Sequence, residues 1–249
     1  MTTPSLMPAF LIRDPLIRSV RLWRVVGMVV LVIAAGSRLL LAQQTDGSRA
    51  ASTAVVTFTL DFPQSNPEHY SMAIDGAGHA RYECTGKVAE NSEEQAYQTE
   101  FEVSARNRER VFGLAKRAQY FAGKVDSGNR KVAFTGAKIL SYQDGQRSIT
   151  AKYNYSSLPA VEQLTALFES MASTLEYGRR LTYYHRYQKL ALDEELKRME
   201  EQAKDEQLSE IQGVTPELKA IVEDSSVINV VRARAKEIIE MGSTAAAGH

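Results

Sequence analysis

Cys84 is the single cysteine of the chain, and His69 is near enough in sequence to be considered as its catalytic base. Thiol catalysis needs the two side chains within hydrogen-bond reach. Apolar and polar residues alternate through 69–84, which places Cys84 on an apolar strand face with Tyr70 and turns His69 to the opposite face. We therefore expect a buried, unreactive thiol here, not a catalytic pair.

Asp75 and His79 flank a short glycine-containing turn and should face each other on the polar side of the same hairpin. The simplest interpretation is a surface pair. A metal centre needs more ligands than His69 and His79 supply, so we predict no metal and no cofactor. The sequence contains no Gly-x-Ser-x-Gly elbow and no phosphate-binding glycine loop. Enzymatic activity is thus uncertain, and the sequence favours its absence.

Residues 177–187 combine tyrosines with arginines, a mixture enriched where proteins contact partners. The candidate contact residues are Tyr177, Arg179, Arg180, Tyr183, Tyr184, Arg186 and Tyr187. Alternatively, Tyr177, Leu181 and Tyr184 continue the packing stripe of a helix while the arginines are solvated. Contact with a membrane surface is less favoured, because an acidic stretch begins at Asp193.

Alternation of apolar and polar residues predicts the strands that carry two of these groups, Cys84 with His69 and Asp75 with His79. It runs through 55–62, 70–74, 80–84 and 97–103, with turn residues between these segments. A three-residue turn over 76–78 sets apolar residues opposite one another: Ile74 with Ala80, Met72 with Tyr82, and Tyr70 with Cys84. An even-numbered turn would place Met72 opposite Arg81, so burial favours the three-residue turn, with Gly78 in a left-handed conformation.

A helix follows these four strands, with Ser104 as its N-cap and Gly123 as its stop. Two more strands, over 131–142 and 147–155, flank a loop whose Asp144-Gly145 pair tolerates positive φ. The order of four strands, one helix and two strands predicts an α+β domain over 53–176, with an antiparallel sheet of about six strands packed by helices.

The last third of the chain is predicted to be a helical C-terminal extension. A helix begins at Ser157 or Pro159, and a charged helical arm over 177–212 carries possible pairs four residues apart, such as Asp193 with Lys197. A short apolar heptad seam in this arm, too brief for a firm coiled coil, comprises Leu192, Leu196, Met199 and Ala203. A helix pair over 213–241 and a disordered tail over 242–249 complete the chain.

The N-terminal segment, residues 1–42, is typical of an export signal or membrane anchor. An apolar run over 25–36 follows several arginines, and small or neutral residues lead to Ala42, where we expect cleavage. A small polar linker spans 43–52. The main domain should therefore lie outside the cytoplasm, in the periplasm, outside the cell or anchored to the membrane.

The charge balance bears on the choice of partner. The chain has 30 basic and 30 acidic residues. Removing the five arginines and one aspartate of 1–42 leaves 25 against 29, a net charge of about −4. Nucleic-acid binding relies on clustered basic residues, so nucleic acid is not an expected partner.

The function expected from these features is that of an exported or membrane-anchored, non-enzymatic binding or scaffold protein of the cell envelope. Its helical arm would contact a protein partner or a second copy of the chain. The alternative is an envelope hydrolase or a small-ligand-binding protein whose polar groups converge only in three dimensions. A pocket lined by His69, His79 and the strand tyrosines would favour that alternative. No motif is specific enough to indicate a family.

Overall fold

The computed structural model describes residues 54–63, 65–129 and 131–247. The export segment over 1–42 and the linker over 43–52 lie outside the described residues. As the alternating pattern predicts, the described chain forms one six-stranded antiparallel sheet. The strands lie in the order β4-β3-β2-β1-β5-β6. The strands are β1 (Val55–Asp61), β2 (His69–Asp75), β3 (His79–Lys87), β4 (Glu94–Glu102), β5 (Ala137–Gln143) and β6 (Ser148–Tyr153). The fold is α+β.

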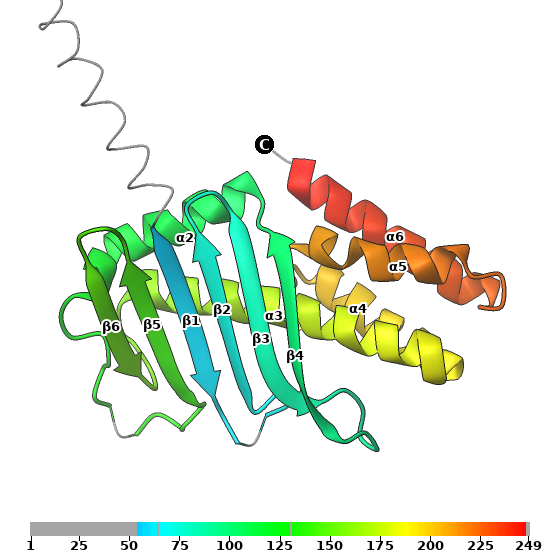
Figure 1. Ribbon diagram of the computed structural model, residues 1–249, viewed down its shortest axis with the longest axis horizontal. Coiled ribbons are helices and arrows are strands. Elements are labelled where there is room, and N and C mark those ends of the chain that lie inside the picture. Colours follow the sequence, from blue (N-terminus) through cyan, green and yellow to red (C-terminus); the bar gives the residue numbers. More distant parts are fainter. Residues whose placement is uncertain (1–53, 64, 130, 248–249) are drawn as a thin grey trace, which may run out of the picture. The chain divides into compact units, whose positions relative to one another are not determined.

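Two helices, α2 (Ala105–Arg117) and α3 (Pro159–Tyr187), pack on one face of this sheet (Figure 1). The core lies between the two layers, where the rings of Phe58 from β1 and Phe168 from α3 stack with centroids 5.4 Å apart. Side chains on the opposite face of the sheet are mostly polar or small, with Val55 and Ile139 as apolar exceptions, and they are wholly or partly exposed. The two-residue period of the strands reflects this one-sided burial.

The register of the β2–β3 hairpin agrees with the prediction. Ile74 pairs with Ala80 and Tyr70 with Cys84, and Gly78 has a φ of +106°. One carboxylate oxygen of Asp75 accepts the backbone N–H groups of Ala77, Gly78 and His79 at 2.8–3.0 Å. The turn is therefore held by the Asp75 side chain as well as by the packing of the strands.

The helix after Ser104 is shorter than predicted. Ser104 is its N-cap, but α2 ends at Arg117, and a 3-10 turn over Gln119–Phe121 follows before Gly123. Positive φ angles at the three residues of this turn redirect the chain, and Phe121 becomes buried in the core. Burial of one aromatic ring thus decides where the helix ends.

The second hairpin also differs in detail. Its first strand begins at Ala137, because Gly136, with a φ of +104°, bends the chain against Leu60. Gly145 is not among the glycines with positive φ. Instead, an Asp144 oxygen accepts the backbone N–H groups of Gln146 and Arg147 at 2.8 and 2.7 Å. The Asp144 side chain therefore stabilises this loop, which does not require a positive φ at Gly145.

Helix α3 continues without a break through the boundary predicted at 176/177. Figure 1 shows its C-terminal half reaching beyond β4, where the remaining helices pack against it and one another. These elements are the 3-10 turn η2 (Lys189–Ala191), α4 (Leu192–Lys204), the 3-10 turn η3 (Ile211–Val214), α5 (Thr215–Glu223) and α6 (Asn229–Ala247). Among the described residues, we find no helix with the length and apolar character needed to cross a membrane.

Details of the C-terminal helices correct several expectations. Leu192, Leu196 and Met199 are buried within the chain's own helices. Asp193 was predicted to pair with Lys197 within one helix. It pairs instead with Arg234, so this contact joins α4 to α6. Helix α6 also continues to Ala247, into the segment predicted as a tail, and Gly242 packs closely on Ile211.

Candidate functional site

Helix α3 separates the predicted contact residues onto different sides. Tyr177 and Arg179 are buried, whereas Arg186 and Tyr187 are exposed near the end of the helix. Arg180, Tyr183 and Tyr184 lie between these extremes. The seven residues therefore form no single surface, because residues spaced through three turns of a helix point in different directions.

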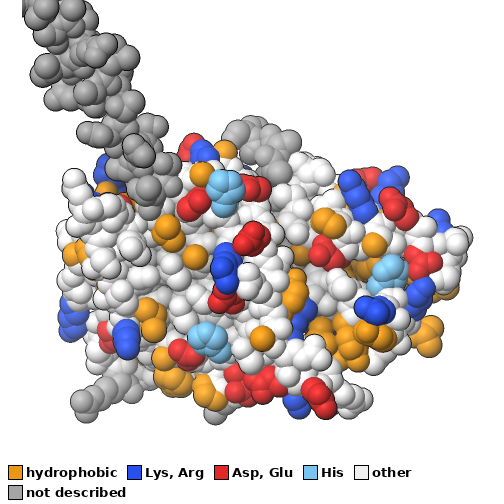
Figure 2. Space-filling view, in the orientation of Figure 1, with side chains coloured by type: hydrophobic (Ala, Val, Ile, Leu, Met, Phe, Trp, Pro, Cys, Tyr) orange, Lys and Arg blue, Asp and Glu red, His pale blue; other side chains and the backbone are white. Residues whose placement is uncertain are grey.

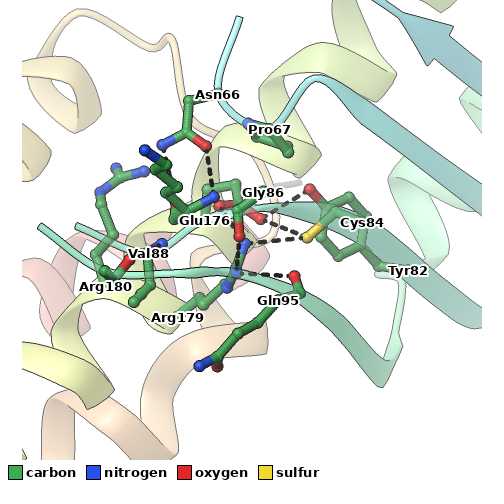
Figure 3. A network of polar contacts seen from close by, with 12 residues as sticks. Asn66, Pro67, Tyr82, Cys84, Gly86, Val88, Gln95, Glu176, Arg179 and Arg180 are labelled. Atoms are coloured by element: carbon green, nitrogen blue, oxygen red, sulfur yellow. Dashed lines mark hydrogen bonds and ion pairs between the residues drawn. The ribbon is translucent and has the colours of Figure 1, made fainter. Parts of the chain in front are cut away.

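The inward side carries a network of polar contacts between α3 and the sheet, shown in Figure 3. Oε1 of Glu176 accepts hydrogen bonds from the Tyr82 hydroxyl at 2.9 Å and the Cys84 thiol at 3.2 Å. Arg179 contacts the other Glu176 oxygen at 3.5 Å. Its Nη2 donates to the carbonyl oxygens of Gly86 at 2.7 Å and Gln95 at 3.3 Å. This network joins α3 to β3 and β4.

The network makes Cys84 unreactive in the folded chain. Burial, with the nearby charge of Glu176, raises the pKa of the Cys84 thiol to about 12. Since the thiolate is the reactive form, a thiol with so high a pKa does not act as a nucleophile near neutral pH. The predicted burial of Cys84 is confirmed. The sequence did not predict that Glu176 and Arg179 contact Cys84. Their positions in the helix are equally compatible with side chains that face solvent.

Arg180 joins α3 to α4. Its Nε donates to Oε1 of the buried Glu195 at 2.5 Å, and its guanidinium lies 4.6 Å from the centre of the Tyr177 ring. Tyr177 is thus covered by the chain's own arginine. Tyr177 is therefore buried, and the partly exposed Arg180 connects α3 to α4.

The outward side forms a surface at the end of α3, which we call the tip surface and define as Tyr183, Arg186, Tyr187 and Leu190. The rings of Tyr183 and Tyr187 lie 5.2 Å apart, and the Arg186 guanidinium lies 5.2 Å from the Tyr187 ring centre. Tyr187 is 62% exposed and Leu190 is 96% exposed. Figure 2 shows hydrophobic side chains gathered with basic ones over this end of the helix.

The connection between α5 and α6 lies beside the tip surface. Oδ2 of Asp224 in this connection contacts His185 at 2.9 Å and Lys189 at 2.5 Å. The hydrogen bond from Lys189, with those from Ser226, lowers the pKa of Asp224 well below its usual range. The same connection presents the exposed side chain of Ile228. These two contacts of Asp224 hold the end of α3 against the α5–α6 connection.

The two histidines considered for chemistry do not converge. His69 begins β2 and His79 begins the neighbouring antiparallel strand, so they lie at opposite ends of the open face. Nδ1 of His69 contacts Asp61 at 2.5 Å, and Nδ1 of His79 contacts Asp75 at 3.0 Å, as predicted for the second pair. The strand tyrosines Tyr70 and Tyr82 point to the other, helix-covered face. The histidines and the strand tyrosines therefore do not line a common pocket.

Comparison with models of protein families found no match to this chain, and comparison with curated proteins also found none. The case for a function consequently depends on the geometry of the chain itself.

Proposed function

We propose that this chain is an exported or membrane-anchored binding or scaffold protein of the cell envelope, and that its tip surface contacts a partner protein. The observation that carries the proposal is the nearly complete exposure of Leu190 beside the exposed Tyr187 and Arg186. A well-packed domain gains nothing in stability from a solvated leucine, whereas a partner that covers it gains apolar burial.

The tip surface is suited in composition to protein contact. Tyrosine and arginine give large contact areas with polar ends, and both are enriched at the energetic centres of interfaces. The contacts of Asp224 with His185 and Lys189 restrain this end of α3 before any partner binds. Contact residues that are already ordered lose less conformational entropy on binding.

The charge of the tip surface favours a partner other than a second copy of the chain. Arg186 forms no ion pair with any residue that the structure describes. A two-fold contact through this surface would bring two copies of Arg186 toward the same patch, and like charges in an interface are unfavourable. We therefore infer a partner that presents an apolar side chain to Leu190 and a carboxylate to Arg186.

The first prediction concerns a variant with Tyr187→Ser and Leu190→Ser. It should bind the partner at least about tenfold more weakly, because the exposed apolar area is removed. Its stability should change by only about 0.5 kcal/mol, since neither side chain is buried. Cross-linking capture from the envelope fraction identifies the partner, and titration calorimetry with the purified pair measures the affinity.

Phe134→Ser is the matched control, because Phe134 is 58% exposed at a distant loop before β5. It should leave the affinity unchanged. Equal binding by the native chain and the Tyr187/Leu190 variant would contradict the proposal. So would a native dimer, seen by analytical ultracentrifugation, that dissociates when the tip surface is changed.

The location outside the cytoplasm has its own test. Mass spectrometry of the protein from an envelope fraction should find either an N-terminus near residue 43 or an intact chain in the membrane. Intact chain dissolved in the cytosol would contradict both export and anchoring.

A further inference from the structure

A cavity of about 300 Å³ lies between α3 and the sheet, on the helix-covered side of the strands. Leu60, Tyr70 and Tyr82 line it from the sheet, and Glu169 and Glu176 line it from α3. Part of its border, including Asn66, Pro67 and Arg180, is shown in Figure 3. Its volume is at the lower end of the range for small-molecule sites.

Most charges around this cavity are neutralised within the chain. Glu176 is paired with Arg179, and Arg180 is paired with Glu195. Glu169, by contrast, has no hydrogen bond or ion pair with another described residue. Glu169 is therefore the one charged residue lining the cavity that has no direct ion-pair partner among the described residues.

Lys138 lies on the other side of Glu169, in a neighbouring hollow of about 320 Å³, but it does not pair with that carboxylate. Its ammonium donates to the carbonyl and hydroxyl oxygens of Thr135 at 3.1 and 2.9 Å and to the Asn154 carbonyl at 3.4 Å. Burial raises the pKa of Glu169, and the charge of Lys138 only partly opposes this. The fold therefore retains a half-buried acidic group whose charged form is disfavoured.

The second observation is an unpartnered hydroxyl in the cavity wall. Tyr70 is only 6% exposed, and its hydroxyl has no hydrogen-bond partner among the described residues. Three other buried tyrosines are partnered, Tyr82 by Glu176 at 2.9 Å, Tyr142 by Asp144 at 3.1 Å and Tyr153 by Thr165 at 2.5 Å. Tyr177, which also lines the cavity, has no hydrogen bond to another described side chain. Most of the Tyr70 side chain is buried, but its hydroxyl oxygen keeps some exposure, and Tyr70 lines the cavity, so this hydroxyl is available to a ligand.

We propose that this cavity binds a small primary ammonium ion that carries a short apolar chain. The ammonium group donates to the Glu169 carboxylate and to the Tyr70 oxygen, and the apolar chain lies against Leu60 and the tyrosine rings. A carboxylate together with aromatic faces is the usual protein environment for an organic cation. This site is separate from the tip surface and does not depend on the partner proposed above.

The test uses the full chain and three probes of similar shape: n-butylammonium, n-butanol and butyrate. Titration calorimetry should detect n-butylammonium binding, with n-butanol and butyrate at least about tenfold weaker, because only the cation forms a charge-assisted hydrogen bond. If n-butylammonium does not bind, or if n-butanol binds equally well, the proposal is overturned.

Glu169→Gln separates a ligand-binding role from a structural one. It should weaken n-butylammonium binding by about tenfold or more. The melting temperature of the ligand-free variant should be unchanged or higher, because a neutral amide replaces a half-buried charge. Undiminished binding by this variant, or a lower melting temperature with no loss of binding, would contradict the proposal.

Two further variants complete the test. Tyr70→Phe removes only the hydroxyl and should weaken n-butylammonium binding several-fold. Glu109→Gln changes an exposed carboxylate on α2 and should leave binding unchanged. Equal losses in Glu109→Gln and Glu169→Gln would indicate general charge attraction and would overturn a defined site.

Discussion

Individual residues on α3 show how much depends on a single buried charge. Glu176 and Arg179 are both buried, and each satisfies the other as well as groups on the sheet. A buried ion pair of this kind need not be stabilising overall, but removing one partner leaves an uncompensated charge in the core. The pair therefore makes the position of α3 on the sheet specific.

Arg179→Met should lower the free energy of unfolding by about 3–5 kcal/mol, because Glu176 loses its counter-charge and two strand carbonyls lose a donor. Adding Glu176→Gln should recover part of this loss. Urea denaturation of the single and double variants measures both effects.

Arg186→Met is the matched control for this prediction, since it makes the same change at an exposed position of the same helix. It should alter stability by only about 0.5 kcal/mol. An effect of Arg179→Met as small as that of the control would show that the network contributes nothing to the fold.

Among the elements, the close approach of η3 to α3 determines how the C-terminal helices pack. Gly178 of α3 faces Val214 of η3, and a Cβ at position 178 would lie 2.5 Å from a Val214 methyl carbon. Glycine is unfavourable within a helix, so its presence here is explained by this contact. Another element thus packs on α3 at the position of Gly178.

Gly178→Ala should destabilise the protein by about 1–3 kcal/mol, because the steric clash with Val214 exceeds the gain in helix propensity. Gly113→Ala on α2 is the control: a Cβ there would meet nothing within 4 Å. It should stabilise the protein by about 0.5–1 kcal/mol. Thermal unfolding of both variants should give shifts of opposite sign, and shifts of the same sign would contradict this explanation.

In the whole molecule, the C-terminal helices are joined to the sheet domain at several distant points. Glu210, which lies just before η3, accepts hydrogen bonds from the backbone N–H and hydroxyl of Ser104 at 3.0 and 2.7 Å. It also accepts one from Asn107 at 2.6 Å. A carboxylate at this position binds the N-cap residue and an amide side chain in the first turn of α2, and it complements the helix dipole. The helical extension therefore holds the N-cap residue of a helix in the sheet domain.

Deletion of 177–249 should consequently prevent cooperative folding, because it removes both Arg179 and Glu210 and uncovers the apolar side of α3. Circular dichroism should show a broad thermal transition, and a dye for exposed apolar surface should bind. A sharp two-state transition in the shortened chain would instead show that residues 53–176 fold independently.

The sequence by itself determined the sheet, the order of its strands along the chain and the β2–β3 register. These features follow from short-range rules, because alternation defines the buried face and a slip of one residue would expose the whole apolar set. The burial of Cys84 and the facing of Asp75 and His79 follow from the same register. The N-cap at Ser104 was also readable, since capping is a local interaction.

The tertiary structure alone decided which polar residues lie inside and what they contact. A helical pattern gives the phase of an apolar stripe, but it does not say that Arg179 reaches two strand carbonyls or that Glu210 meets Ser104 far along the chain. The cavity beside Glu169 and Tyr70 likewise arises from elements distant in sequence. Such contacts depend on how whole helices pack on the sheet, and no local preference of the chain encodes that geometry.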